Sequence, residues 1–424
     1  CPDGGTWQHS GDASKDFKVW SCSTGDFAAD IAAVAGLLDE LYPAMADPAA
    51  MGLPVRDTGS KEDGDDDRID VYLLDVGPTR ERNGQQQAID GETVAAVSES
   101  GPFAGSTASS YLMLGRPRLD DDDELRRTAI HTFFHSLQYA HNFAITTVDP
   151  ARVPWFFEAS AAWAEWEYFR ARSARVHNEY FIETFAAMPH VPLVQPAGVE
   201  SLVAGRASRA SYIWPFFMQQ QAGGSPQPIF DAWKAAGNQQ DWNGFHAAID
   251  AQLPFASAFR DFTVRNLNRD LGAATAPGYD ALDPDFPVGD EPTLTYDEVT
   301  TRAGPAVEHR LGGTTGAGLG PLAAQYDYTA IDPGAGIRML TLDFSGITPA
   351  PNGDVTVLTR APDGTWTRRD HAPGDVLTLC FDTPGQAVEE LYVIVGNHAR
   401  VSDWSAPSAD SMAGSYTAKS TASC

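Results

Sequence analysis

The amino-acid sequence predicts an α+β protein, in which a small β-sheet with a helical bundle is followed by a C-terminal antiparallel β-sandwich. Two observations predict this class. Up to about residue 272, short apolar runs with strand character are interspersed with longer stretches of helical periodicity. From residue 322 onward, apolar residues alternate in short runs separated by turn residues. Four of these runs are predicted strands: Met339–Phe344, Val355–Leu358, Val376–Leu379 and Leu391–Val395.

Composition divides the chain into four segments. We expect residues 1–25 to be an irregular, disulfide-anchored segment, residues 26–272 to form the helix-rich domain and residues 306–424 to form the β-sandwich. Residues 273–305 are rich in Pro, Asp, Gly and Thr, which is typical of a linker. A chain of 424 residues is long enough for two or three domains with a substantial core.

The helix-rich domain begins with an amphipathic helix and two short strands. Apolar residues recur at helical spacing from Asp26 to about Tyr42, and Pro43 marks the predicted end of this helix. The β-branched and aromatic content of Ile69–Leu74 favours a strand, and Tyr111–Leu114 is a second short strand. The second strand either offers its edge to an extended peptide or is a core strand.

Helices predominate from there to about residue 271. Five carboxylates at residues 120–124 precede a helix that extends to about Tyr139, and the positive end of the helix dipole stabilises such a cluster. A second helix has Pro154 in its first turn and extends to about Arg172. Further helices are expected at residues 211–221 and 228–236.

Charge and hydropathy restrict the kind of partner. The chain has 29 basic and 57 acidic residues, and its net charge of −28 argues against binding to nucleic acid or to an anionic membrane. No run approaches 18 consecutive apolar residues, so we expect no membrane span. We expect the protein to be a monomer.

The cysteines and the start of the chain indicate an extracellular protein. Local disulfides between Cys1 and Cys22 and between Cys380 and Cys424 are the economical pairing, although four cysteines allow three connectivities and could also be free thiols. The chain starts at Cys1 without a leader peptide, so we expect a processed chain that is secreted or at the cell surface. A lipid-modified Cys1 is an alternative that would exclude its bridge to Cys22.

An acidic run, Asp57–Asp67, precedes the first strand. It contains Asp63, Asp65 and Asp67 in alternation and is followed by Asp70, and oxygen-rich loops of this kind can hold Ca²⁺. The order of residues does not match an EF-hand, so a solvated acidic loop is the favoured interpretation.

The residues with the clearest chemistry lie between His131 and His135. Two histidines four residues apart on a helix project from one face, so both imidazoles can reach one metal ion. Glu158 on the following helix can supply a third ligand, and the small residues after it permit close helix approach. The histidine pair alone is a weak signal, because two hydrogen-bonded histidines in a helix interface have the same spacing.

These residues resemble the gluzincin clan of zinc metallopeptidases, and more narrowly a group of secreted bacterial metalloproteases. In that group one helix carries H-E-F-x-H and the next helix begins W-x-x-E-G/A-S/T-A-x-W. The resemblance extends from about Arg68 to Pro215 and implies a zincin-like metallopeptidase domain that acts on a protein or peptide substrate. The matching residues are His131, Phe133, His135, Trp155, Glu158, Ala159, Ser160, Ala161 and Trp163.

Carried over by position, the resemblance implies that His131, His135 and Glu158 bind Zn²⁺. Glu165 is two helical turns beyond Glu158 and is either a hydrogen-bond partner of a ligand histidine or a solvent-facing charge. Tyr212 lies where related enzymes place a hydroxyl that stabilises the tetrahedral intermediate, although a buried aromatic would give the same pattern.

One position departs from the family pattern. The residue after the first histidine is a glutamate in the family, where it takes a proton from the zinc-bound water, and here it is Thr132. A threonine hydroxyl does not ionise usefully near neutral pH. The chain is therefore a natural relative that has lost proteolysis, an inactivated form of an active protease, or an enzyme in which a nearby carboxylate such as Glu165 took over.

Three functions remain open from the sequence. The first is a secreted zinc metalloendopeptidase scaffold whose activity is weak or absent because of Thr132. The second is a non-catalytic pseudopeptidase that binds a peptide, a glycan or a surface partner. The third is an unrelated metal reaction at the histidine pair, for which copper or iron would replace zinc.

Overall fold

The computed structural model of the chain contains two compact units. One unit consists of residues 1–176 and 212–252, and the other consists of residues 177–211 and 253–424. These boundaries differ from the division expected at residue 272, because the chain passes between the units more than once. The structure describes residues 6–9, 14–22, 28–47, 49–56, 66–74, 79–82, 85–88, 91–96, 107–115, 121–143, 155–169, 173–187, 189, 191–193, 207–237, 239, 241–272, 278–286, 297–298, 304–311, 318–331, 336–348, 352–382, 387–400 and 410–424.

One layer of the first unit is a sheet of five strands. The strands are β1 (Trp7–His9), β2 (Phe17–Cys22), β3 (Ile69–Leu74), β6 (Gly91–Ala96) and β7 (Ser109–Gly115), while β4 (Thr79–Arg82) and β5 (Gln85–Ala88) pair with each other. Their order is β1-β2-β3-β7-β6. β2, β3 and β7 are parallel, and β1 and β6 are antiparallel to their neighbours.

This sheet changes two of the sequence-based expectations. The expectation that residues 1–25 are irregular is wrong, because β1 and β2 lie within them and β2 pairs with β3. The two predicted strands are confirmed as β3 and β7. β7 pairs with β3 on one side and with β6 on the other, so it is a core strand and has no free edge to offer.

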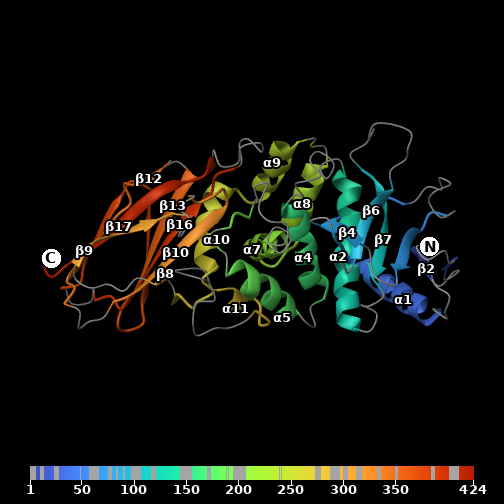
Figure 1. The fold of residues 1–424 in the computed structure, drawn as a ribbon, viewed down its shortest axis with the longest axis horizontal. Helices are drawn as coiled ribbons and strands as arrows, with labels where there is room; N and C mark the ends of the chain where they lie inside the picture. Colours follow the sequence, from blue (N-terminus) through green and yellow to red (C-terminus); the bar gives the residue numbers. More distant parts are fainter. Residues whose placement is uncertain are drawn as a thin grey trace. The chain divides into compact units, whose positions relative to one another are not determined.

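Helices α1 (Ala28–Met45) and α2 (Asp122–Asn142) pack on this sheet, and α2 runs beside β6 and β7 (Figure 1). Alternate residues of the strands, such as Val19 and Val71, are completely buried, because successive side chains point to opposite faces. Phe133 of α2 packs on the buried face, with its ring 5.4 Å from that of Phe17. Residues two apart on a helix point roughly 200° apart. His131 and His135 therefore lie on a different side of α2 from Phe133.

Helix α1 extends beyond its predicted end. Pro43 lies inside the helix, and the last helical residue is Met45, whose side chain is completely buried. The backbone N–H of Ala46 still donates to the carbonyl of Tyr42 at 2.8 Å. A proline inside a helix removes its own N–H and crowds the carbonyl four residues earlier, and burial of the Met45 side chain offsets this cost in the last turn.

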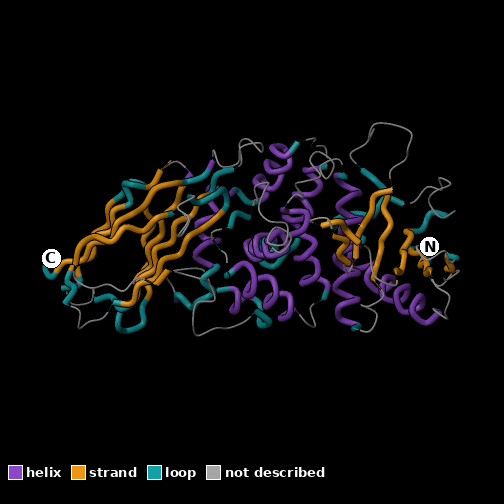
Figure 2. Tube along the Cα trace, in the orientation of Figure 1, coloured by secondary structure: helices purple, strands orange, loops and turns teal. Residues whose placement is uncertain are grey.

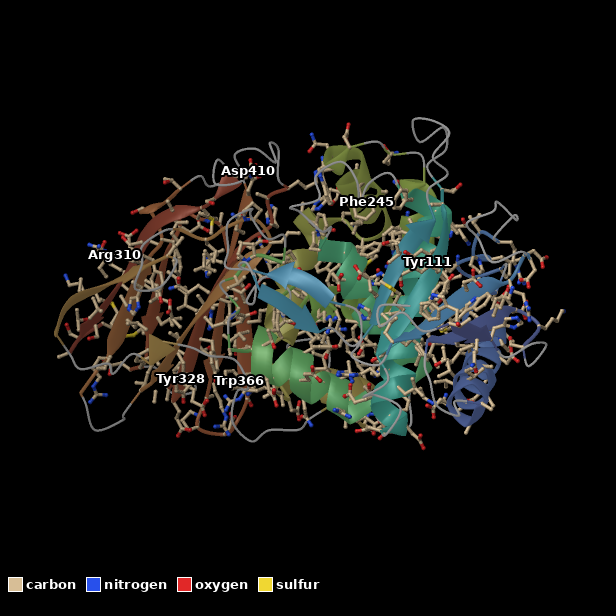
Figure 3. The ribbon with its side chains drawn as sticks, turned by 45° about the vertical axis from the view of Figure 1, so that its right-hand side comes forward. Tyr111, Phe245, Arg310, Tyr328, Trp366 and Asp410 are labelled. Atoms are coloured by element: carbon tan, nitrogen blue, oxygen red, sulfur yellow. A yellow bond between two sulfur atoms is a disulfide. The ribbon has the colours of Figure 1, made fainter. Side chains whose placement is uncertain are left out.

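The described part of the first unit also contains the helices α4 (Trp155–Tyr168), α5 (Ser173–Val176), α7 (Ile213–Gln221), α8 (Gln227–Ala236) and α9 (Trp242–Gln252). The two predicted helices of the histidine motif are confirmed as α2 and α4. Asp121 caps α2 by accepting from the backbone of Asp123 and Glu124. α4 ends at Tyr168, earlier than expected, and Pro154 lies outside the described residues. Phe245 of α9 (Figure 3) packs 5.3 Å from the ring of Trp233 on α8.

The second unit contains the expected β-sandwich (Figure 2). Its strands, among the residues that the structure describes, are β8 (Asp297–Glu298), β9 (Gly304–Arg310), β10 (Ala323–Ala330), β11 (Met339–Asp343), β12 (Ile347–Thr348), β13 (Gly353–Arg360), β14 (Trp366–His371), β15 (Val376–Cys380), β16 (Glu390–Asn397) and β17 (Ala413–Thr421). One sheet has the order β14-β13-β16-β10-β8, and the other has the order β12-β17-β11-β15, with β9 paired to β17. All pairs are antiparallel except β8 with β10. Leu342, Val357 and Val393 share one buried core.

The four predicted sandwich strands are confirmed as β11, β13, β15 and β16. The predicted disulfide between Cys380 and Cys424 is also present and ties the end of β15 to the end of the chain. Cys1 lies outside the described residues.

The second unit also contains η3 (His177–Phe185), α10 (Phe255–Arg265) and α11 (Tyr279–Leu282). α10 packs on β13 and β16. The expected linker, residues 273–305, includes α11 and β8, and its Tyr279 is completely buried and donates to Asn266 at 2.9 Å. Part of this segment therefore belongs to the folded core in spite of its composition.

The acidic run before β3 is described only at its end, and residues 57–65, which include Asp63 and Asp65, lie outside the described residues. Asp66 accepts from Arg68 at 2.8 Å and lies 3.5 Å from the ammonium group of Lys18. Hydrogen bonds from Arg68 lower the pKa of Asp66 to about 2. Among the described helices, none is long and apolar enough to cross a membrane.

Candidate metal centre

The three predicted metal ligands come together where α2 lies against α4. Nε2 of His131 lies 3.4 Å from Oε2 of Glu158, and Nε2 of His135 lies 3.9 Å from Oε1 of the same carboxylate. The two Nε2 atoms are 3.1 Å apart. Both imidazoles are buried, whereas the side chain of Glu158 is 20% exposed. The three ligand atoms lie within 4.8 Å of one another, so this group could hold a metal ion.

Local structure explains why these side chains converge. His131 and His135 are one helical turn apart, so their rings project from the same side of α2. Glu158 lies in the first turn of α4, where the helix dipole favours a carboxylate. The next residues of α4 include Ala159 and Ala161, which are completely buried and small enough to let the two helices approach closely.

A buried carboxylate holds the outer nitrogen of His131. Oε1 of Glu165 lies 2.7 Å from Nδ1 of His131, and Oε2 of Glu165 lies 3.7 Å from Nε of Arg127. Arg127 also donates to Glu124 at 3.1 Å, and Arg175 pairs with the same Glu124. Because a carboxylate paired with a guanidinium accepts hydrogen bonds, Nδ1 of His131 carries a proton, and in the neutral imidazole Nε2 then keeps its lone pair.

A glutamine holds the outer nitrogen of His135. Oε1 of Gln138 lies 2.6 Å from Nδ1 of His135. The imidazole also stacks on Phe157, with ring centroids 4.1 Å apart and an interplanar angle of 8°. An amide oxygen can only accept, so Nδ1 of His135 donates, and in the neutral imidazole its Nε2 then also keeps a lone pair.

The two imidazoles and the carboxylate therefore present only acceptors to one another. Two neutral Nε2 atoms at 3.1 Å cannot form a hydrogen bond, and Glu158 adds a negative charge beside them. A positive charge among the three groups relieves this repulsion, and either a proton shared by the rings or a metal ion provides it. Two histidines and one carboxylate with an open side are a ligand set of catalytic metal sites.

Thr132 stands where the sequence resemblance predicts a general base, but its surroundings are those of a packed helix residue. Its hydroxyl donates to the carbonyl of Thr128 at 2.8 Å and lies 3.2 Å from that of Ala129. Its own carbonyl accepts from the hydroxyl of Thr93 on β6 at 2.6 Å. A Cβ added at Gly91 would come within 2.9 Å of the Thr132 methyl group. β6 thus packs directly on this turn of α2.

Two other predicted residues have clear environments. The Glu165 carboxylate contacts Nδ1 of His131, on the side of the ring opposite to the nitrogen that faces Glu158, so this geometry does not favour Glu165 as a replacement base. Tyr212 precedes α7 and is completely buried, with its ring 6.5 Å from that of Phe216. This is the environment of a core aromatic, and the catalytic role of Tyr212 stays a prediction.

Gln138 is a site residue that the sequence pattern did not reveal. It lies three residues after His135 and therefore on the same side of α2. A glutamine is common on helices, so its spacing alone carries little information. Its role is visible only through its contact with Nδ1 of His135.

Comparisons with known proteins do not extend the motif to a family assignment. No protein-family model matches this chain, and a search of curated proteins finds no match. The candidate function is therefore argued from the side chains of the site.

Proposed function

We propose that the chain has the scaffold of a secreted zinc metallopeptidase and that its catalytic activity is weak or absent in this form. One observation carries the proposal: Nδ1 of His131 and Nδ1 of His135 each lie within hydrogen-bond distance of an outer acceptor, while both Nε2 atoms converge with Glu158. The Cys380–Cys424 disulfide supports secretion, because such bonds persist in oxidising compartments.

The spacing of the donor atoms suits zinc. Tetrahedral ligands at about 2.0–2.1 Å from Zn²⁺ lie roughly 3.3 Å from one another. The separations among His131, His135 and Glu158 are 3.1, 3.4 and 3.9 Å. Two imidazole nitrogens do not suit Ca²⁺, which takes six to eight oxygen ligands. Ferrous iron also accepts two histidines and one carboxylate, so elemental analysis has to separate it from zinc.

Each residue of the site has a part in the proposed chemistry. Bound zinc would polarise a substrate carbonyl and lower the pKa of water at the open position to about 7. Glu165 and Gln138 orient the two histidines, and the partly exposed Glu158 marks the side from which a substrate enters. β6 is the last strand of its sheet among the described strands, so we infer that an extended protein or peptide substrate pairs with it.

The weak activity follows from Thr132. Its hydroxyl is buried and donates to the backbone of its own helix, so it cannot take a proton from water. Loss of a general base costs about 10² to 10⁴ in rate.

The packing of Thr132 favours a second candidate, a non-catalytic pseudopeptidase that binds a peptide, a glycan or a surface partner. The methyl group of Thr132 packs beneath Gly91, so position 132 serves the contact between α2 and β6. In this candidate the metal site stabilises the fold and the open side binds without cleavage.

Elemental analysis of the purified protein tests the metal. We expect one zinc per chain, and we expect none in a His131→Ala variant. Stoichiometric copper or iron in place of zinc would support the third possibility, an unrelated metal reaction. If the correctly folded protein takes up no metal ion, both the proposed zinc site and the unrelated metal reaction are contradicted.

A Thr132→Glu variant tests the peptidase scaffold. With zinc bound, we expect it to cleave an unfolded protein at least about 100-fold faster than the parent chain, since it regains a general base. Thr128→Glu is the matched control, because it adds the same charge one turn earlier on α2 and should leave the rate unchanged. If folded, zinc-loaded Thr132→Glu cleaves nothing, the peptidase scaffold is rejected and the binding candidate is preferred.

A further inference from the structure

A chain of hydrogen bonds leads from α8 through α4 to the metal centre. Nε1 of Trp233 donates to Oγ of Ser160 at 3.0 Å, and Nε2 of Gln138 donates to the same oxygen at 2.9 Å. The Ser160 hydroxyl donates to the carbonyl of Phe156 at 2.6 Å. The amide of Gln138 ends the chain with Oε1 at 2.6 Å from Nδ1 of His135.

The chemistry of each group decides which groups donate and which accept in this series of hydrogen bonds. An indole N–H can only donate, so the Ser160 oxygen must accept from Trp233. The single Ser160 proton is used on Phe156, so Gln138 can approach Ser160 only with its NH₂ group. The second proton of that NH₂ group reaches the carbonyl of Phe157 at 2.9 Å, and a carbonyl can only accept. Both neighbours therefore direct the amide oxygen of Gln138 toward His135.

We propose that Gln138 is the positioning residue that keeps the proton of His135 on Nδ1, and that Ser160 and Trp233 hold the Gln138 amide in the required orientation. This inference rests on the proposed metal site. The hydrogen bond made by one ring nitrogen of a histidine decides which nitrogen remains for a metal ion. Nε2 of His135 is thereby kept unprotonated and directed toward His131 and Glu158.

Because these side chains are buried, each hydrogen bond of the network is needed. Gln138, Ser160 and Trp233 are each completely buried, so water does not replace a lost partner. The stacking of Phe157 fixes the plane of the His135 ring, which leaves the amide of Gln138 to determine its tautomer. The two histidines are held differently. Nδ1 of His131 contacts the charged Glu165, whereas Nδ1 of His135 contacts the neutral amide of Gln138.

The experiment compares Gln138→Met, which keeps the volume and removes the acceptor, with two other variants. Gln138→Glu keeps an acceptor for Nδ1. Gln219→Met is the matched control, because Gln219 is also buried, accepts from Trp163 at 2.8 Å and donates to Glu167 and Gly224 at 3.0 Å. Nitrogen NMR of histidine-labelled, metal-free protein, above the usual histidine pKa, reports the tautomer of His135, and chelator competition gives the zinc affinity.

We expect the parent chain and Gln219→Met to carry the His135 proton on Nδ1. Gln138→Met should populate the Nε2–H form and bind zinc about 10- to 100-fold more weakly. Gln138→Glu should restore the Nδ1–H form, which a purely structural role of the glutamine would not do.

A parent-chain spectrum with the His135 proton on Nε2 overturns the proposal, whether or not any variant folds. Equal zinc affinity in Gln138→Met and Gln219→Met overturns it as well. If the parent chain keeps the Nδ1–H form but binds no zinc, the proposed function fails while the role of Gln138 in setting the tautomer stands.

Discussion

The contact between Glu165 and His131 gives the sharpest test of how the metal centre is held. Glu165→Gln keeps the size of the side chain and an oxygen that can accept from Nδ1 of His131, but it removes the negative charge. Arg127 then keeps Glu124 as its counter-charge at 3.1 Å, so no cation is left buried alone. The substitution therefore isolates the electrostatic part of the contact.

The expected magnitude follows from the strength of charged hydrogen bonds. A hydrogen bond to a charged group contributes about 1.5–3 kcal/mol and one between neutral groups about 0.5–1.5 kcal/mol. Glu165 is 2% exposed, so solvent screens this difference little. The loss is about 1–1.5 kcal/mol in zinc binding, which corresponds to an affinity about tenfold weaker. Glu165→Ala removes the acceptor as well and should weaken binding about 100-fold.

Competition with a chelating dye at constant pH and ionic strength measures these affinities. Glu167→Gln is the control, because Glu167 lies on the same helix and accepts from Gln219 at 3.0 Å. We expect this control to bind zinc as the parent chain does. Equal affinities for Glu165→Gln and the parent chain would show that Glu165 is only an ion-pair partner of Arg127.

Two further predictions concern stability. Gly91→Ala should destabilise the fold by about 1–3 kcal/mol in urea unfolding, because the new Cβ would meet the methyl groups of Thr128 and Thr132 at 2.6 and 2.9 Å. Gly36→Ala in α1 has open space and should stabilise the fold by about 0.5–1 kcal/mol, and equal effects of the two substitutions would refute the close approach of β6 to α2. The pKa of Asp66 is lowered to about 2 by Arg68, so its carboxylate stabilises the fold above its ordinary pKa of 3.8 and loses this effect as pH falls through about 2. Asp66→Asn should therefore lower the unfolding free energy by about 1 kcal/mol at neutral pH, after allowance for solvent screening, and by much less near pH 2; a pH-independent difference would contradict the assignment.

Local sequence patterns predict a helix or strand correctly where its own residues define it. The strand Ile69–Leu74 has the bounds that its β-branched and aromatic residues predict, and the sandwich strands agree closely with their alternating runs. The sequence pattern does not predict β2, because the segment is short and Lys18 and Trp20 interrupt its apolar residues. Its identity as a strand depends on pairing with β3, which lies about fifty residues later in the chain.

For the candidate metal site, too, the sequence predicts one part and the structure supplies the other. Helical periodicity by itself places His131 and His135 on one side of a helix, and the motif around Glu158 adds a third ligand. The structure supplies the partners of Nδ1. Gln138 contacts Phe157 and Ser160, which are 19 and 22 residues away, and Glu165 is 34 residues from His131. No spacing rule connects such positions, because the contacts arise from the packing of α2 against α4.

The sequence by itself thus predicted the mixed α+β class, the candidate ligand set and the departure from the motif at Thr132, since each depends on residue type and on spacing within one or two helices. Only the tertiary structure decided which strands pair, that β7 has no free edge, and that the Nε2 atoms of both histidines face Glu158 while each Nδ1 lies beside an outer acceptor. The physical reason is that hydrogen-bond polarity and burial are properties of neighbours in space. In this protein those neighbours come from helices α2, α4 and α8.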